Sequence, residues 1–132
     1  MSGNRAILDS NTIIYASKGL IDADKLLSEN EFYYASIISL IEVYSHEFQD
    51  AVERTIIDEI LASIEIADVD RAIADQAIIY RKNKNKKIKL PDAVILATAK
   101  ILGAELITNN VTDFRGVDTS VELVGIDELR IK

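Results

Sequence analysis

The sequence predicts an α/β fold in which helices cover both faces of a central parallel sheet. Short apolar segments that end in helix-capping residues alternate along the chain with longer amphipathic segments, and this alternation is typical of parallel sheets with covering helices. The 132 residues, 48% of them hydrophobic, suffice for one core. We therefore expect a single domain over residues 1–132, built as an α/β/α three-layer fold around a sheet of about five strands.

The first half of the chain contains two strand patterns and four helical patterns. The expected strands are residues 5–8 and 31–35, and the expected helices are residues 11–17, 21–27, a segment capped by Ser36, and 51–61. The first strand is predicted because apolar residues close on Asp9, Ser10 and Asn11, a helix-capping cluster. The helix after Ser36 is predicted because apolar residues recur at helical spacing as far as Phe48.

The second half repeats the alternation. The expected strands are residues 64–67, 104–108 and 121–124, the expected helices are residues 72–82 and 91–102, and residues 109–113 are expected to form a polar loop. Pro91 near the start of the last helix and Gly103 just past its end match the known asymmetry of helix termini. Because nearly every position between them is apolar, that helix is expected to be buried on most sides.

Four acidic residues lie at the ends of apolar segments or within one: Asp9, Glu42, Asp92 and Asp113. Ligand sites in open parallel sheets lie outside the carboxyl ends of the strands, where Asp9 and the 109–113 loop are expected. Ionised carboxylates that cluster repel one another, so a divalent cation is needed to neutralise them. The chain has no cysteine and one histidine, so oxygen ligands and Mg²⁺ or Mn²⁺ are favoured over zinc.

Each acidic residue also has an ordinary structural interpretation. Asp9 can cap a helix, Asp92 can favour a helix N-terminus, and Asp113 can stabilise a turn. Glu42 can pair with His46 four residues later on the same helix face. A zinc half-site at that pair is disfavoured, because no second histidine or cysteine can complete it.

The net charge of −7 argues against a protein that coats nucleic acid nonspecifically, but the charge is unevenly distributed. Residues 81–89, here called the basic segment, hold six of the fifteen basic side chains and no acid. The six are Arg81, Lys82, Lys84, Lys86, Lys87 and Lys89. The segment is either a solvated helix end and loop or a phosphate-binding surface beside Asp92.

The N-terminus enters the first strand too soon for a signal peptide, and no apolar run approaches the ~20 residues that span a bilayer. A cytoplasmic protein is therefore expected.

Taken in order, these segments resemble the PIN-domain ribonucleases, especially the VapC-like toxins of toxin-antitoxin pairs. The resemblance rests on four motifs: Ile7-Leu-Asp9-Ser-Asn-Thr12, Ser39-Leu-Ile-Glu42, Leu90-Pro-Asp92-Ala-Val-Ile-Leu-Ala-Thr-Ala99, and Leu106-Ile-Thr-Asn-Asn-Val-Thr-Asp113-Phe114. Many family members have an aspartate at the position of Asn110, two residues after the threonine. Either Asp113 or Asn110 therefore fills the fourth ligand position.

The resemblance implies a PIN-like fold and Mg²⁺- or Mn²⁺-dependent cleavage of RNA that leaves a 5′-phosphate. Its implied catalytic and metal-binding residues are Asp9, Glu42, Asp92 and Asp113, supported by Asn11, Ser39, Thr108 and Asn110. The basic segment would then hold the RNA backbone, so activity should fall as salt rises. The resemblance also implies a homodimer and a cognate antitoxin as partner.

The residues fit other classes of protein less well. A phosphoacceptor receiver domain would need adjacent acids after the first strand and a lysine after a late strand, and neither is present. P-loop and dinucleotide enzymes are disfavoured because the five glycines form no phosphate-binding cluster. A PIN-fold module that binds or regulates without catalysis is the main alternative, and Asn110 is the residue that favours it.

Overall fold

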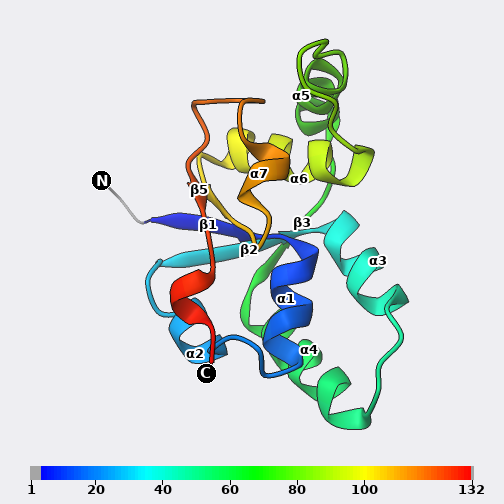
Figure 1. Ribbon diagram of the computed structural model, residues 1–132. Coiled ribbons are helices and arrows are strands. Elements are labelled where there is room, and N and C mark those ends of the chain that lie inside the picture. Colours follow the sequence, from blue (N-terminus) through cyan, green and yellow to red (C-terminus); the bar gives the residue numbers. More distant parts are fainter. Residues whose placement is uncertain (1–3, 132) are drawn as a thin grey trace.

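The computed structural model describes residues 4–131 and contains five strands and seven α-helices there (Figure 1). The strands are β1 Arg5–Leu8, β2 Phe32–Ser36, β3 Glu65–Ala67, β4 Glu105–Ile107 and β5 Leu123–Val124. The helices are α1 Ser10–Ser17, α2 Ala23–Leu26, α3 Ile37–Ser45, α4 Ala51–Ser63, α5 Arg71–Arg81, α6 Leu90–Leu102 and α7 Val111–Phe114, followed by a 3-10 turn, η1 Asp127–Leu129.

The five strands form one parallel sheet in the order β3-β2-β1-β4-β5, which confirms the predicted fold class. The chain builds outward from β1 through β2 to β3, then crosses back and adds β4 and β5 on the other side of β1. The strand order therefore reverses between β1 and β4. A parallel sheet with this reversal opens a crevice at its carboxyl edge at that point.

Helices cover both faces of the sheet, with α5, α6 and α7 on one side and α1, α2 and α4 on the other (Figure 1). Side chains of β1 alternate between the two layers: Ile7 packs with α5 and α6, whereas Ala6 and Leu8 pack with α1 and α4. All three are fully buried. The sheet thus lies between two hydrophobic cores, and one helix layer packs on each of its faces.

The helix predicted after Pro91 is the most buried of the molecule. Helix α6 begins at Leu90 and ends at Leu102, and Gly103 closes it with a positive φ of 64°. Every residue from Ala93 to Ala99 is buried. The prediction of a helix enclosed on most sides is confirmed, and its N-terminal turn is fixed at the edge of the sheet.

Several boundaries differ from prediction. The helix expected over residues 21–27 is limited to α2, because Ile21 forms an antiparallel bridge with Arg130 and Asp22 caps the helix. Helix α3 stops at Ser45, before Phe48. Residues 109–113 are not a simple loop, because α7 begins at Val111. The turn η1 was not predicted.

No helix within residues 4–131 combines the length and apolar character needed to cross a bilayer.

Candidate active site at the carboxyl edge of the sheet

Asp9 lies at the point where the strand order reverses. It follows β1 directly, and its backbone N–H donates to the carbonyl oxygen of Ile107 at the end of β4, at 3.2 Å. One carboxylate oxygen accepts the backbone N–H of Thr12 at 2.8 Å and so caps α1. The other accepts the hydroxyl of Thr108, which follows β4. The capping interpretation is therefore confirmed, and the same side chain lies at the carboxyl edge of the sheet.

Glu42 approaches from α3 and meets the start of α1. Its Oε1 atom accepts the hydroxyl of Ser10 at 2.6 Å. The side chain is exposed and not at the core boundary, because α3 turns this face away from its packed side, where Val43 is buried. In residues 4–131 no hydrogen bond or ion pair joins Glu42 to His46; the His46 ring instead packs edge-on against Phe48. The alternative of a Glu42–His46 pair is wrong.

Asp92 stands in the first turn of α6, directly after Pro91, and is partly buried. Asp113 stands in the first turn of α7. The side-chain amide of Asn110 donates to Asp113 Oδ2 at 2.5 Å, and the Asn110 backbone N–H donates to the Thr108 hydroxyl oxygen at 3.0 Å. Asn110 thus supports Asp113 while Thr108 links that loop to Asp9.

The four carboxylates influence one another electrostatically. Burial, followed by the negative charges of Asp113, Asp9 and Glu42, raises the pKa of Asp92 to about 6, with Lys89 opposing. Burial also raises the pKa of Asp9, against the lowering effect of hydrogen bonds from Thr108 and Thr12, and Glu42 adds to the rise. Acids from three other segments therefore act on Asp92 at the carboxyl edge of the sheet, with Asp113 exerting the largest charge effect.

A profile of the PIN domain family matches residues 6–120. The chain belongs to the PIN domain family. The match spans β1 to the loop before β5 and includes all four acids. Among the curated proteins, none matches the chain.

Solved structures of PIN domains share its fold. A toxin-antitoxin complex from Klebsiella pneumoniae is 31% identical, with 89% of this chain and 98% of that one covered and a TM-score of 0.71. VapBC2 from Rickettsia felis, bound to a DNA fragment from its promoter, is 25% identical, with 93% and 99% covered and a TM-score of 0.78. VapBC-5 from Mycobacterium tuberculosis, at 21% identity, 92% and 98% coverage and a TM-score of 0.70, shares the fold. This chain is a VapC-like PIN domain.

The donor set of this PIN domain suits a hard divalent cation, because it consists of carboxylate, hydroxyl and amide oxygens. Within the described part of the chain, no three acidic or histidine side chains are close enough together to hold one ion directly. Mg²⁺ does not require such a cage, because it usually retains several waters and binds through one or two carboxylates. The chemistry of these residues fits such an ion.

The other predicted supporting residues differ in their placement. Thr108 and Ser39 are fully buried, and the hydroxyl of Ser39 has no hydrogen-bond partner within residues 4–131. Asn11 is exposed on α1. The sequence does not indicate Ser10 as the partner of Glu42, because 32 residues separate the two. The one feature that could have pointed to Ser10 is its position next to Asp9.

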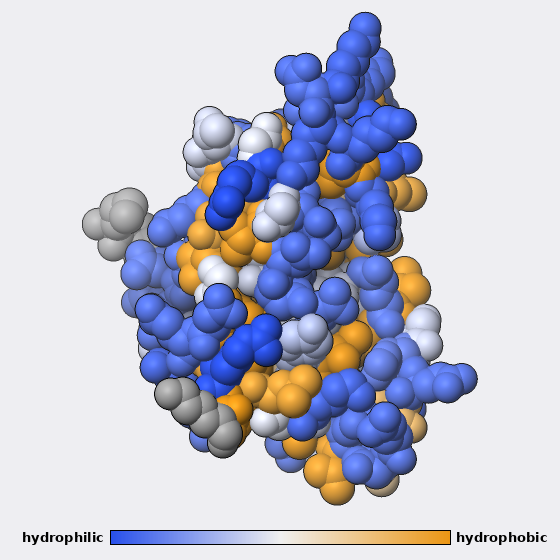
Figure 2. Space-filling model, viewed as in Figure 1, coloured by the Kyte–Doolittle hydropathy of each residue, from blue (hydrophilic) through white to orange (hydrophobic). Residues whose placement is uncertain are grey.

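The basic side chains of residues 81–89 do not form one free patch, because two of them bind backbone carbonyl oxygens. Figure 2 shows hydrophilic side chains over the upper end of the molecule, where α5 and the segment that follows it lie in Figure 1. The Arg81 guanidinium donates to the carbonyl oxygen of Ile88 at 2.7 Å, and Lys86 Nζ donates to the carbonyl oxygen of Thr112. The four lysines at positions 82, 84, 87 and 89 are exposed.

The raised pKa of Asp92 predicts how pH affects the stability of the metal-free protein. Because the pKa is raised from its ordinary value of 3.8 to about 6, ionising Asp92 destabilises the fold, and this loss develops as pH rises through that interval. In EDTA, Asp92→Asn should exceed the wild type in free energy of unfolding by about 1 kcal/mol near neutral pH, allowing for solvent screening of a partly exposed group.

Urea unfolding of both proteins at several pH values measures this difference. The gap should narrow as pH falls toward about 4. Glu59→Gln, at an exposed carboxylate on α4, serves as the control for a lost surface charge. A gap that is absent near neutral pH, or that widens toward acid, would contradict the charge coupling at Asp92.

Proposed function

We propose that this protein is a Mg²⁺- or Mn²⁺-dependent endoribonuclease and the toxin of a type II toxin-antitoxin pair. PIN domains are generally nucleases, and membership of that family supports hydrolysis of phosphodiester bonds. The single observation that supports the proposal is that the charges of Asp113, Asp9 and Glu42 all act on Asp92 and, together with burial, raise its pKa to about 6.

The proposed roles follow from the position of each side chain. Asp9 and Asp92 are assigned as direct metal ligands because they are the more buried of the four carboxylates and lie at the starts of α1 and α6. Glu42 and Asp113 are more exposed and complete the shell or orient the attacking water. When bound, the metal would activate that water and stabilise charge on the leaving oxygen.

The remaining polar residues hold this arrangement. Thr108 fixes the rotamer of Asp9 through its hydroxyl, and Asn110 orients Asp113. Ser39, Asn11 and Ser10 contribute hydroxyl and amide groups near Glu42 and the start of α1. The proposed substrate is RNA, held by its backbone on the exposed lysines of the basic segment, and the product carries a 5′-phosphate.

The proposed partners are a cognate antitoxin and a second copy of the chain. The similar Klebsiella pneumoniae structure is a toxin-antitoxin complex, which supports an antitoxin here. Exposed apolar side chains on α3 and α5, namely Ile41, Ile78 and Ile79, support a protein interface. The proposed location is the cytoplasm, where RNA is available.

The proposal is tested by incubating the purified protein with labelled RNA and Mg²⁺, then adding EDTA. Cleavage should stop in EDTA and return with excess Mg²⁺ or Mn²⁺, because the carboxylates alone cannot neutralise the developing charge. End-group analysis should find a 5′-phosphate. Cleavage that persists in EDTA would contradict the metal-dependent proposal, and a folded protein that never cleaves RNA would favour the inactive binding module.

A further inference from the structure

We propose that Lys86 is a positioning residue that fixes α7, the helix carrying Asp113, rather than a contact for the RNA backbone. This inference rests on the proposed function, because it concerns the geometry of the proposed metal centre. It divides the basic segment into side chains that build the site and side chains left available for phosphate.

The decisive contact joins two segments that are 26 residues apart. Lys86 Nζ donates a hydrogen bond to the backbone carbonyl oxygen of Thr112, at 2.5 Å. Thr112 lies inside α7 and immediately precedes Asp113. A lysine ammonium beside the last carbonyls of a helix supplies a missing hydrogen bond and opposes the negative end of the helix dipole.

Helix α7 needs such external contacts because it has only four residues. One helical turn is not stable by itself, since nucleation costs more than a single turn returns. The buried side chain of Phe114 and the bond from Lys86 tie α7 to the rest of the molecule, and the Asn110 amide binds Asp113 from the residue before the helix. Asp113 is exposed, so core packing does not fix its direction. Its position relative to Asp92 therefore depends on how α7 is held.

The backbone around Lys86 is shaped to present it toward α7. The side-chain oxygen of Asn83 accepts the backbone N–H groups of Asn85 and Lys86, at 2.9 and 3.3 Å, and forms a tight turn. Downstream, Ile88 is buried and its carbonyl oxygen accepts the Arg81 guanidinium. The segment before α6 is thus anchored at both ends.

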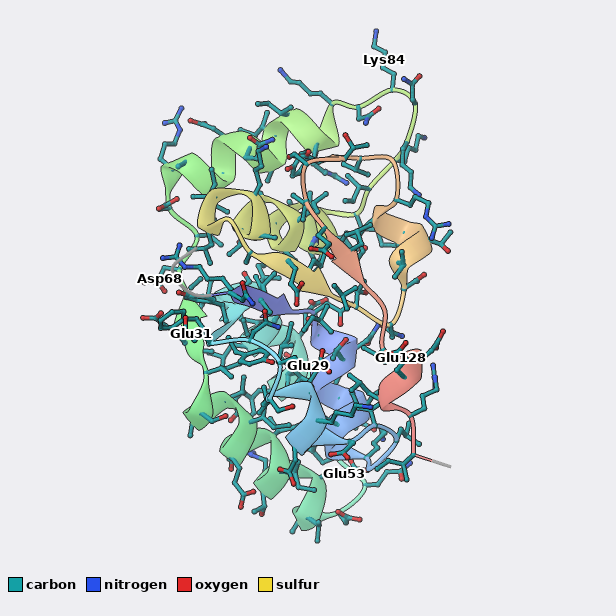
Figure 3. The ribbon with its side chains drawn as sticks, turned by 90° about the vertical axis from the view of Figure 1, so that its left-hand side faces the viewer. Glu29, Glu31, Glu53, Asp68, Lys84 and Glu128 are labelled. Carbon is teal, nitrogen blue, oxygen red and sulfur yellow. The ribbon has the colours of Figure 1, made fainter. Side chains whose placement is uncertain are left out.

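Lys84 provides the contrast within the same segment. It is exposed, and in Figure 3 its side chain extends from the tip of the loop away from the rest of the molecule. Lys84 can meet a phosphate without disturbing the site. The two lysines therefore carry the same charge and differ in what they touch, which makes Lys84 the matched control for Lys86.

The test compares Lys86→Met, Lys86→Arg and Lys84→Met by amide hydrogen exchange and by RNA cleavage. In the metal-free, RNA-free protein, the Asp113 and Arg115 amides donate to Asn110 and Val111, so their exchange reports whether α7 is formed. In Lys86→Met these amides should exchange about tenfold faster, because one charge-assisted bond is lost. Lys84→Met should leave their exchange unchanged, and Lys86→Arg should restore it.

The kinetic readout separates positioning from RNA binding. Lys86→Met should lower kcat and the affinity for Mn²⁺ by about tenfold, with the salt dependence of KM retained. Lys84→Met should instead raise KM and weaken its salt dependence. If Lys86→Met behaves like Lys84→Met in either readout, or if exchange speeds up without a fall in kcat, the inference is overturned. A wild-type protein that cleaves no RNA refutes the proposed function. In that case the exchange rates of the Asp113 and Arg115 amides still test whether Lys86 fixes α7.

Discussion

Replacement of Asp92 by asparagine should lower the rate of RNA cleavage by about 100-fold or more. Loss of groups that only orient a metal ligand costs about 10- to 100-fold, so loss of a direct ligand should cost at least as much. Asparagine keeps the size of the side chain but removes the negative charge needed for a divalent cation. Helix α6 should remain intact, because Pro91 and the buried run from Ala93 to Ala99 define it.

The measurement is single-turnover cleavage of labelled RNA in saturating Mg²⁺, with circular dichroism to verify the fold. Glu59→Gln on α4 removes an exposed carboxylate far from the crevice and should cleave at the wild-type rate. Comparison of Asp92→Asn with Glu59→Gln separates loss of a metal ligand from loss of one negative charge on the protein. Asp92→Asn cleaving within about threefold of wild type would exclude Asp92 as a ligand.

Thr108→Val should lower both activity and stability, because this buried hydroxyl serves two partners. It donates to Asp9 Oδ2 and accepts the backbone N–H of Asn110. Valine fills the same space but leaves a carboxylate oxygen and an N–H group unpaired, which should cost about 1–3 kcal/mol of unfolding free energy. Since Asp9 loses its orientation, cleavage should fall about 10- to 100-fold.

Two further variants distinguish orientation of Asp9 from simple destabilisation. Thr98→Val makes the same change at another fully buried threonine, whose hydroxyl bonds only within α6, to the Val94 carbonyl oxygen. It should leave cleavage near the wild-type rate. Thr108→Ser retains the hydroxyl and should recover most of the activity and Mn²⁺ affinity. Equal activity losses in Thr108→Val and Thr98→Val would refute the positioning role of Thr108.

The convergence of charge has a consequence for the metal-free state. The charges of Asp113, Asp9 and Glu42 disfavour ionised Asp92 in the folded protein, and burial of Asp9 and Asp92 strengthens the effect. Local instability of this kind is common at functional sites, where activity is retained at the expense of stability. The opposite effects expected for Asp92→Asn on stability and on cleavage are two results of the same arrangement.

Features coded by neighbouring residues were predictable from the sequence. The strand that ends at Asp9, the cap at Ser36 and the buried helix between Pro91 and Gly103 all follow from local capping and periodicity. The edge of the sheet was predictable too, since carboxyl ends of parallel strands meet at one side. These features together predicted where Asp9 and the loop after β4 would lie.

Features decided by distant contacts were not predictable. Helix α7 is one turn long and depends on Lys86, Phe114 and Asn110, so its local sequence is typical of a loop. The spacing of apolar residues in α3 correctly indicates a helix, but it does not tell which side faces solvent, and Glu42 is exposed. Lys86 is 26 residues from Thr112 and Ser10 is 32 residues from Glu42, so local sequence patterns do not indicate either contact.

The most direct test of the carboxylate metal centre is a Mn²⁺ titration of the RNA-free protein, with binding measured by isothermal calorimetry or electron paramagnetic resonance. The wild type should bind Mn²⁺ with a dissociation constant in the micromolar to millimolar range, because the carboxylates of Asp9 and Asp92 supply the charge. The double variant Asp9→Asn, Asp92→Asn should lose that binding while remaining folded. Equal binding by the two proteins, or no binding by the wild type, would contradict the metal centre.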